Sequence, residues 1–170
     1  MTRGFTRILV PTDFSAPSDA ALATAKDLAA QFGASLHVVH VLEDPYAIAA
    51  YSADALGYLP PGIKESWQRE AEKRFETLLT PAERARFKVT TTVLFSGSAA
   101  KEIVEHAQSN NIDLIVMGTH GRGGVAHLLL GSVTERVVRT ALCPVLTMRG
   151  TATVRADDAV QPAAEPVVAG

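Results

Sequence analysis

The chain has 170 residues, 47% of them hydrophobic, with a formal net charge of −2 at pH 7, which suits one ordinary hydrophobic core and not two. So small a net charge provides no basic surface for a nucleic acid or a membrane. Its single cysteine excludes an internal disulfide framework and a multi-cysteine zinc site. The first residues lack the apolar segment of a signal peptide, and no apolar run approaches the roughly 20 residues of a membrane helix. We therefore expect a cytoplasmic domain.

The first predicted strand runs from Arg7 to Val10 and is followed by Pro11-Thr12-Asp13. Asp13 is thereby placed at the carboxyl end of a central strand, the edge where open α/β sheets bind ligands. A helix is expected from Ala16 to about Phe32, with Ser15 as its N-cap. A carboxylate beside a helix start is a common cap, so Asp13 alone favours capping. The glycine-rich loop further along the chain shifts the balance toward a ligand contact.

The second strand is expected from Ser35 to Leu42. Its two histidines, His37 and His40, would face opposite sides of the sheet, so they cannot chelate one metal ion. Structural or solvent-facing roles are expected for both. The next stretch, Glu43 to Ser66, is interpreted as a long loop with at most a short helix. Surface packing explains its aromatic residues better than a pocket does.

Three regular elements are predicted before the glycine-rich loop. A helix is expected from Trp67 to about Leu79 and is broken at Thr80-Pro81, with a charged turn at Ala82 to Arg86. The β-branched run from Phe87 to Leu94 predicts a third strand. A helix follows from Ala99 to about Ser109.

The most informative stretch begins with the apolar run Leu114 to Met117, which predicts a strand buried on both faces. A glycine-rich loop follows, and it ends at Gly131-Ser132 directly before a helical pattern, with Ser132 as the expected N-cap. The first N–H groups of a helix have no intrahelical acceptor and lie at the positive end of its dipole, so this arrangement suits an anion. The loop matches neither the P-loop nor the G-x-G-x-x-G pattern.

The spacing is Gly118-x-x-Gly121, nine residues, then Gly131-Ser132. This resembles the universal stress protein family, in particular the branch that binds ATP through G-2x-G-9x-G-[ST]. The segments Ile8–Ser15, Leu36–Leu42 and Cys143–Arg149 also fall where that family has its first, second and last strands.

The resemblance covers about Phe5 to Arg149, so we expect one nucleotide-binding domain over residues 1–149 and a disordered tail over 150–170. Strands that alternate with helices favour a parallel, doubly wound α/β sheet. The resemblance implies a five-stranded sheet of order 3-2-1-4-5 with helices on both faces. That order places the first and fourth strands side by side at the switch point, where Asp13 and Gly118 would meet.

The resemblance also implies which residues contact the phosphates. Gly131, Ser132 and the N–H of Val133 are expected to hold them, while Gly118 and Gly121 let the main chain approach ribose and phosphates. Two basic residues of the loop, His120 and Arg122, could contact phosphate as well. Exposed basic side chains, however, more often face water.

At the other end of the ligand, Thr12 and Asp13 are expected to contact the nucleoside or a metal ion. Val41 would hold adenine through its main chain, and Pro11 and Met117 would form apolar walls. No catalytic residue and no dedicated metal site is expected. Magnesium could be held by Asp13 together with the phosphates.

These residues favour an ATP-binding regulatory or stress-response protein. A slow metal-dependent ATP hydrolase or phosphotransfer enzyme is the alternative, but no general base or arginine finger is evident. A receiver-type switch with Asp13 as phosphoacceptor would need an acidic pair and a lysine at other strand ends, and these are missing. A pure interaction module is opposed by the intact glycine motif, and a flavin or nicotinamide site by the absence of its fingerprint.

The last predicted strand, Val145 to Met148, is apolar and would be an unpaired edge in a monomer. Pairing with a second copy would cover it, an arrangement that the resemblance also implies. We therefore expect a homodimer through this strand.

Overall fold

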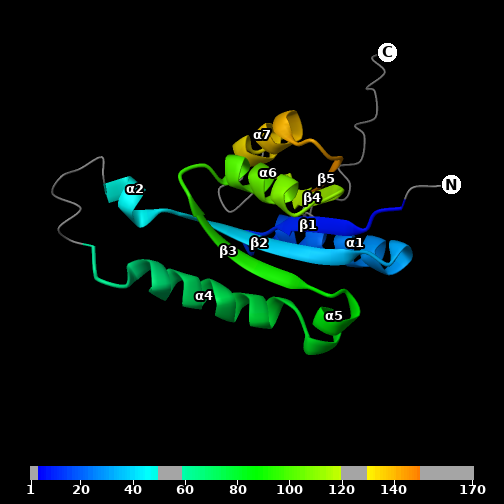
Figure 1. The fold of residues 1–170 in the computed structure, drawn as a ribbon, viewed down its shortest axis with the longest axis horizontal. Helices are drawn as coiled ribbons and strands as arrows, with labels where there is room; N and C mark the ends of the chain where they lie inside the picture. Colours follow the sequence, from blue (N-terminus) through cyan, green and yellow to red (C-terminus); the bar gives the residue numbers. More distant parts are fainter. Residues whose placement is uncertain (1–3, 50–58, 120–129, 150–170) are drawn as a thin grey trace, which may run out of the picture.

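The computed structural model describes residues 4–49, 59–119 and 130–149. Its elements, in chain order, are β1 (Arg7–Pro11), α1 (Ala16–Phe32), β2 (Ser35–Glu43), α2 (Pro45–Ala49), α4 (Ile63–Leu78), α5 (Pro81–Arg86), β3 (Thr90–Ser96), α6 (Ala99–Ser109), β4 (Leu114–Gly118), α7 (Ser132–Thr140) and β5 (Val145–Met148) (Figure 1). None of the helices in these ranges is both long and apolar enough to cross a membrane.

The five strands form one parallel sheet of order β3-β2-β1-β4-β5, as predicted. β1 pairs with β2 on one side and with β4 on the other, where Ile8 lies opposite Leu114 and Leu9 opposite Ile115. The strand order therefore reverses between β1 and β4. In open α/β sheets this is the point where ligands bind, outside the carboxyl ends of the strands.

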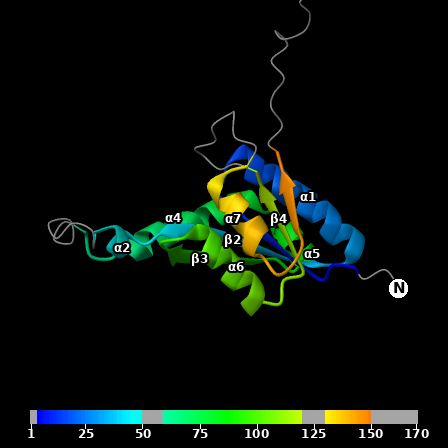
Figure 2. The same ribbon diagram turned by 90° about the horizontal axis from the view of Figure 1, so that it is seen from above.

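Helices cover both faces of the sheet, as predicted. A first core contains Ile8 and Val10 of β1 together with side chains of α1 and α4, including Phe75. A second core contains Leu9 of β1, side chains of α6, and Val137 of α7. Successive residues of β1 thus belong to opposite cores, because side chains alternate along a strand. In Figure 1, α6 and α7 lie above the sheet and α4 and α5 below it. Figure 2 shows α1 running alongside β4 and β5, which it contacts.

Local signals set the ends of α1 as predicted. α1 follows Ser15 in an extended conformation and ends at Gly33, whose φ of 70° is the left-handed conformation that glycine adopts without strain. Its alanines Ala21, Ala25 and Ala29 are buried and allow close packing on the sheet.

The second half of the predicted loop Glu43–Ser66 is partly helical. α4 begins at Ile63 rather than Trp67, after Gly62 with a φ of 78°. Trp67, the first residue of the helix expected here, is 37% exposed. The burial of α4 instead centres on Ala71 and Phe75. Part of this loop, residues 50–58, lies outside the described residues.

Two boundaries after α4 also differ from the prediction. The expected charged turn is the helix α5, because Thr80 and Glu83 form a capping box around Pro81: the Thr80 Oγ1 accepts from the Glu83 N–H at 3.2 Å, and the Glu83 Oε2 accepts from the Thr80 N–H at 2.9 Å. The expected strand from Phe87 begins only at Thr90. Phe87 is the C-cap of α5 and lies buried in the first core.

Candidate functional site

The candidate site lies where β1 and β4 end and α7 begins. The Gly131 N–H donates to the Thr119 carbonyl oxygen at 2.7 Å, and the Thr134 hydroxyl donates to the Gly118 carbonyl oxygen at 2.8 Å. These two bonds hold the first turn of α7 against the end of β4. The structure thereby brings Gly131 and Ser132, at the start of α7, close to Gly118 at the end of β4.

The N-cap of α7 is Gly131 and not Ser132. Gly131 has an extended backbone, with φ −72° and ψ 155°, and its carbonyl oxygen accepts the first helical bond from the Glu135 N–H at 2.9 Å. Ser132 is therefore the first helical residue. Any residue can adopt the dihedral angles of Gly131. A requirement for glycine at this position would therefore come from a lack of room for a Cβ atom and not from the backbone conformation.

The exposed start of α7 presents the donors that an anion needs. Ser132 and Val133 are both exposed, and their N–H groups belong to the first turn, where no intrahelical acceptor exists. The Gly131 N–H is engaged with Thr119, so it is not one of these donors. The carboxylate in the first turn, Glu135, forms an ion pair with Arg139 one turn further along, 3.7 Å between Oε1 and Nε.

Gly118 has a packing role. A Cβ atom at this position would lie 2.9 Å from the carbonyl carbon and from the Cβ of Pro17, in the first turn of α1. Such distances are too short for non-bonded carbon atoms, so the glycine lets α1 pack directly on β4. Its predicted approach to the ribose remains a prediction.

Thr12 builds the turn between β1 and α1. It is buried, and its N–H donates to the Val39 carbonyl oxygen at 2.8 Å. Its hydroxyl oxygen accepts from the Phe14 N–H at 2.9 Å and lies 3.0 Å from the Ser18 hydroxyl. Its carbonyl oxygen accepts from His40 Nδ1 at 2.7 Å. The Thr12 side chain therefore points into the fold.

Asp13 is half-buried beside Thr12 and has a capping role. One carboxylate oxygen, Oδ1, accepts from the Ser15 N–H at 3.2 Å and from the Ser15 hydroxyl. Both are local bonds that stabilise the start of α1. The capping interpretation of Asp13 is thus present in the structure, and its predicted ligand contact stays a prediction.

The apolar residues expected around the ligand lie at the same edge of the sheet. Pro11 is buried at the end of β1, and Met117 is buried in the second core. Val41 is half-buried and packs against that core from β2. The remaining expected site residues, His120, Gly121 and Arg122, lie outside the described residues.

Two residues near this edge were not predicted. Thr134 is buried and anchors α7, whereas two valines of the same helix, Val133 and Val138, are 38% and 47% exposed. A helical stripe centred on the buried Val137 would have placed Thr134 inward. Phe14 adopts a left-handed backbone with φ 60°, for which the sequence has no signal because aromatic residues rarely adopt it.

Among the described residues, the surroundings of two histidines and of the cysteine favour structural roles. His40 is buried on the face of Thr12, whereas His37 lies on the opposite face near His106, as predicted for two residues three apart on a strand. Burial raises the pKa of the Cys143 thiol above its ordinary value, which disfavours the nucleophilic thiolate. Within the described ranges, no three histidine, cysteine or acidic residues gather to hold a metal ion.

Comparison with known proteins identifies the family. The model of the universal stress protein family matches residues 4–149. The universal stress protein MJ0531 of Methanocaldococcus jannaschii is 36% identical over 145 residues, which is 85% of this chain and 82% of that protein.

Solved structures agree in fold. The protein MJ0577 of the same organism superposes with a TM-score of 0.72 at 29% identity, covering 86% of this chain and 97% of its own. A universal stress protein of Archaeoglobus fulgidus in complex with dAMP has a TM-score of 0.57 and 21% identity, covering 86% and 99%, and shows the fold alone. This chain belongs to the universal stress protein family.

Proposed function

We propose that the chain binds ATP at the carboxyl edge between β1 and β4 and acts as a nucleotide-dependent regulatory or stress-response module. One observation carries this proposal: the G-2x-G-9x-G-S spacing ends at a helix whose exposed first turn is held against the end of β4. Phosphate groups would bind to the N–H groups of Ser132 and Val133 and to the Ser132 hydroxyl.

The geometry favours a phosphate chain for two reasons. First, the free N–H groups and the dipole of α7 both favour negative charge at the helix start. Second, the bonds from Gly131 to Thr119 and from Thr134 to Gly118 already fix this turn. Binding therefore requires little ordering of the first turn of α7, which improves affinity.

The nucleoside would lie across the neighbouring strand ends. β2 pairs with β1 so that Val39 lies opposite Pro11, and Val41 follows two residues later toward the same edge. Asp13 would contact the nucleoside, and the main chain of Val41 would contact adenine. The Archaeoglobus fulgidus structure contains dAMP, so this fold is compatible with an adenine nucleotide.

Two measurements test the proposal. Mass spectrometry of small molecules released from freshly purified protein, repeated after addition of ATP and magnesium, should detect an adenine nucleotide. Calorimetric titration should show Gly131→Val weakening ATP binding by tenfold or more and Ser132→Ala by about tenfold, the size expected for one charge-assisted hydrogen bond.

The chain offers a matched control for both variants. The same dipeptide, Gly97-Ser98, lies directly before α6, so it resembles Gly131-Ser132 at the start of α7. A Cβ atom on Gly97 would meet no other atom within 4 Å. Gly97→Val and Ser98→Ala should therefore leave ATP affinity unchanged. Equal affinity in wild type and Gly131→Val would refute the site.

The enzymatic alternative is separated by turnover. A slow hydrolase or phosphotransfer enzyme would release phosphate from ATP with magnesium, and Asp13→Ala would abolish the signal. If the protein only binds ATP, wild type and Asp13→Ala should show the same background release of phosphate.

We also propose a homodimer through β5. This strand is an edge of the sheet. Its own Leu146 is 38% exposed, and two apolar residues that precede it in the chain, Val138 and Leu142, are 47% and 84% exposed. A second copy that pairs with β5 would satisfy the unpaired backbone groups and cover these side chains.

A further inference from the structure

The turn that carries Thr12 and Asp13 contains a strained residue. Phe14 has φ 60°, a left-handed conformation that a bulky side chain adopts only when its surroundings hold it there. Such residues cluster at functional sites, and this one directly follows Asp13, which is proposed to contact the nucleoside. The interactions that hold Phe14 therefore bear on the site.

Three side chains from two other elements surround the Phe14 ring. The His40 ring of β2 lies 4.7 Å away and the Phe75 ring of α4 lies 5.5 Å away, centroid to centroid. The Arg74 guanidinium carbon of α4 lies 4.1 Å from the centroid of the Phe14 ring, within cation–π range. The ring is thus held between the sheet and α4.

The same contacts reach the backbone of the turn. His40, which packs on the ring, also donates from Nδ1 to the Thr12 carbonyl oxygen at 2.7 Å. The Phe14 N–H donates to the Thr12 hydroxyl oxygen at 2.9 Å. Displacing the ring would therefore disturb both bonds and the position of Asp13 between them.

We propose that Phe14 and Arg74 are positioning residues that hold the turn from Thr12 to Ser15 in the conformation needed at the nucleoside end of the nucleotide. This inference rests on the proposed function. The cation of Arg74 favours one placement of the ring, the ring maintains the left-handed backbone, and that backbone fixes Asp13. In this way α4, which carries none of the residues proposed to contact the nucleotide, influences how tightly the nucleoside is bound.

The test compares two ligands, ATP and adenosine, by calorimetric titration. Because Arg74 acts at the nucleoside end, Arg74→Gln should weaken ATP and adenosine binding by the same factor, about three- to tenfold. Ser132→Ala should weaken ATP and leave adenosine unchanged, because adenosine has no phosphate. Arg74→Lys should recover part of the loss, since an ammonium group also interacts with an aromatic ring.

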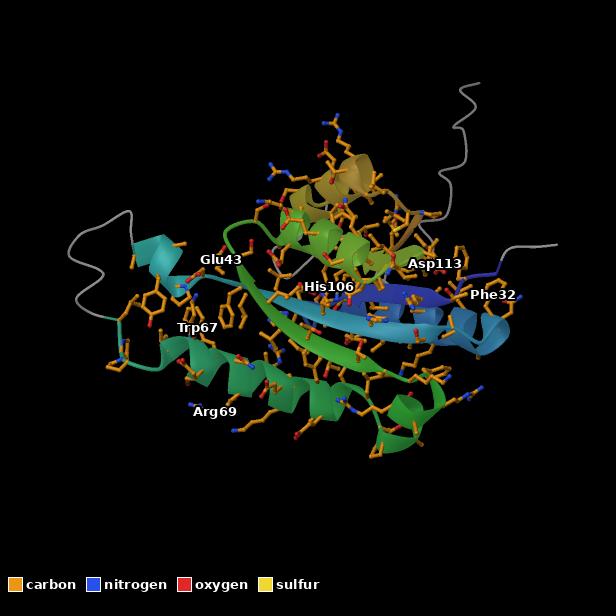
Figure 3. The ribbon with its side chains drawn as sticks, viewed as in Figure 1. Phe32, Glu43, Trp67, Arg69, His106 and Asp113 are labelled. Carbon is orange, nitrogen blue, oxygen red and sulfur yellow. The ribbon has the colours of Figure 1, made fainter. Side chains whose placement is uncertain are left out.

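Two further variants isolate the effect. Arg69→Gln removes an exposed arginine from the same helix, on its side away from the sheet (Figure 3), and should change neither affinity. Phe14→Gly removes the ring but tolerates φ 60° without strain. It should also weaken both ligands equally, whereas unchanged binding would show that the ring has no positioning role.

The possible failures are distinguishable. Wild-type protein that binds ATP, with unchanged binding in Arg74→Gln and Phe14→Gly, would overturn the positioning role and leave the proposed function standing. A loss confined to ATP in Arg74→Gln would place Arg74 at the phosphates and also overturn it. Wild-type protein that binds neither ligand would overturn the proposed function itself.

Discussion

The hydroxyl of Thr134 donates a 2.8 Å hydrogen bond to the carbonyl oxygen of Gly118 and joins the first turn of α7 to the last residue of β4. Thr134 is only 3% exposed, so water does not compete for this bond. The bond spans the two ends of the segment that contains the glycine-rich loop. It therefore sets where the exposed N–H groups of α7 lie relative to the strand ends.

Replacing Thr134 by valine should destabilise the protein by about 1–3 kcal/mol, because the buried carbonyl oxygen of Gly118 loses its donor. Thr134→Ser keeps a hydroxyl and should retain most of the stability. Urea unfolding measures the change. Thr140→Val is the control on the same helix: its hydroxyl bonds to the Arg136 carbonyl oxygen at 2.8 Å in an exposed position, where water can replace it. A similar loss of stability in Thr134→Val and Thr140→Val would show that the buried bond of Thr134 contributes no more than the exposed bond of Thr140.

Adding one carbon at Gly118 should destabilise the fold. The Cβ of Gly118→Ala would lie 2.9 Å from two Pro17 atoms, so α1 must shift on β4, at a cost of about 1–3 kcal/mol. Gly97→Ala, with open space around its Cβ, is the control and should lie within about 0.5 kcal/mol of wild type. Thermal unfolding compares the two, and equal melting temperatures would contradict the close packing of Pro17.

Acidification should weaken the fold through the pair His37 and His106. Burial, then the neighbouring His106 and Arg7, lower the pKa of His37, and burial lowers the pKa of His106 against the opposing charge of Glu102. The unfolded chain binds protons at the ordinary pKa of 6.5, while the folded chain resists them. The stability contribution of these histidines is therefore present above pH 6.5 and is lost as the pH falls through the lower folded pKa values.

The variant His106→Leu tests this assignment. The His106 Nε2 is buried and has no hydrogen-bond partner among the described residues, so leucine removes a buried polar atom as well as a titrating group. Urea unfolding between about pH 7 and about pH 5 should give a shallower decline in the free energy of unfolding than in wild type. Parallel declines would assign the acid sensitivity to other groups.

The proposed dimer predicts that a charge on β5 prevents association. Leu146 is 38% exposed on this edge strand, and Leu146→Lys would bury an unpaired ammonium group in the interface. Light scattering after size exclusion should give the mass of a dimer for wild type and of a monomer for the variant. Trp67→Lys, at a 37% exposed position on α4, should remain dimeric. A wild-type monomer at all accessible concentrations would refute the interface.

The elements that the sequence predicted best are those with strong local signals. α1 follows Ser15 and ends at Gly33, and β4 is a continuous apolar run. The boundaries that differed depend on contacts beyond the local sequence. Phe87 has strand character, yet it closes α5 because its side chain enters the first core.

The candidate site shows the same division. The strand–loop–helix order correctly predicted a helix start at Gly131 and Ser132, although the N-cap is Gly131 and not Ser132. It could not show that the Gly131 N–H is already bonded to Thr119, or that the Thr12 side chain points inward. Both depend on bonds between strands and turns that the chain order does not specify.

By itself, then, the sequence determined the order of the strands, most of the helices and the resemblance to the family, because periodicity, caps and glycine spacing can be recognised in short stretches of the chain. Only the tertiary structure decided that Gly118 must be glycine to accommodate Pro17, that Thr134 anchors α7, and that Arg74 lies over the Phe14 ring. The physical reason is that these contacts join residues distant in the chain, and packing brings them together only when both cores form.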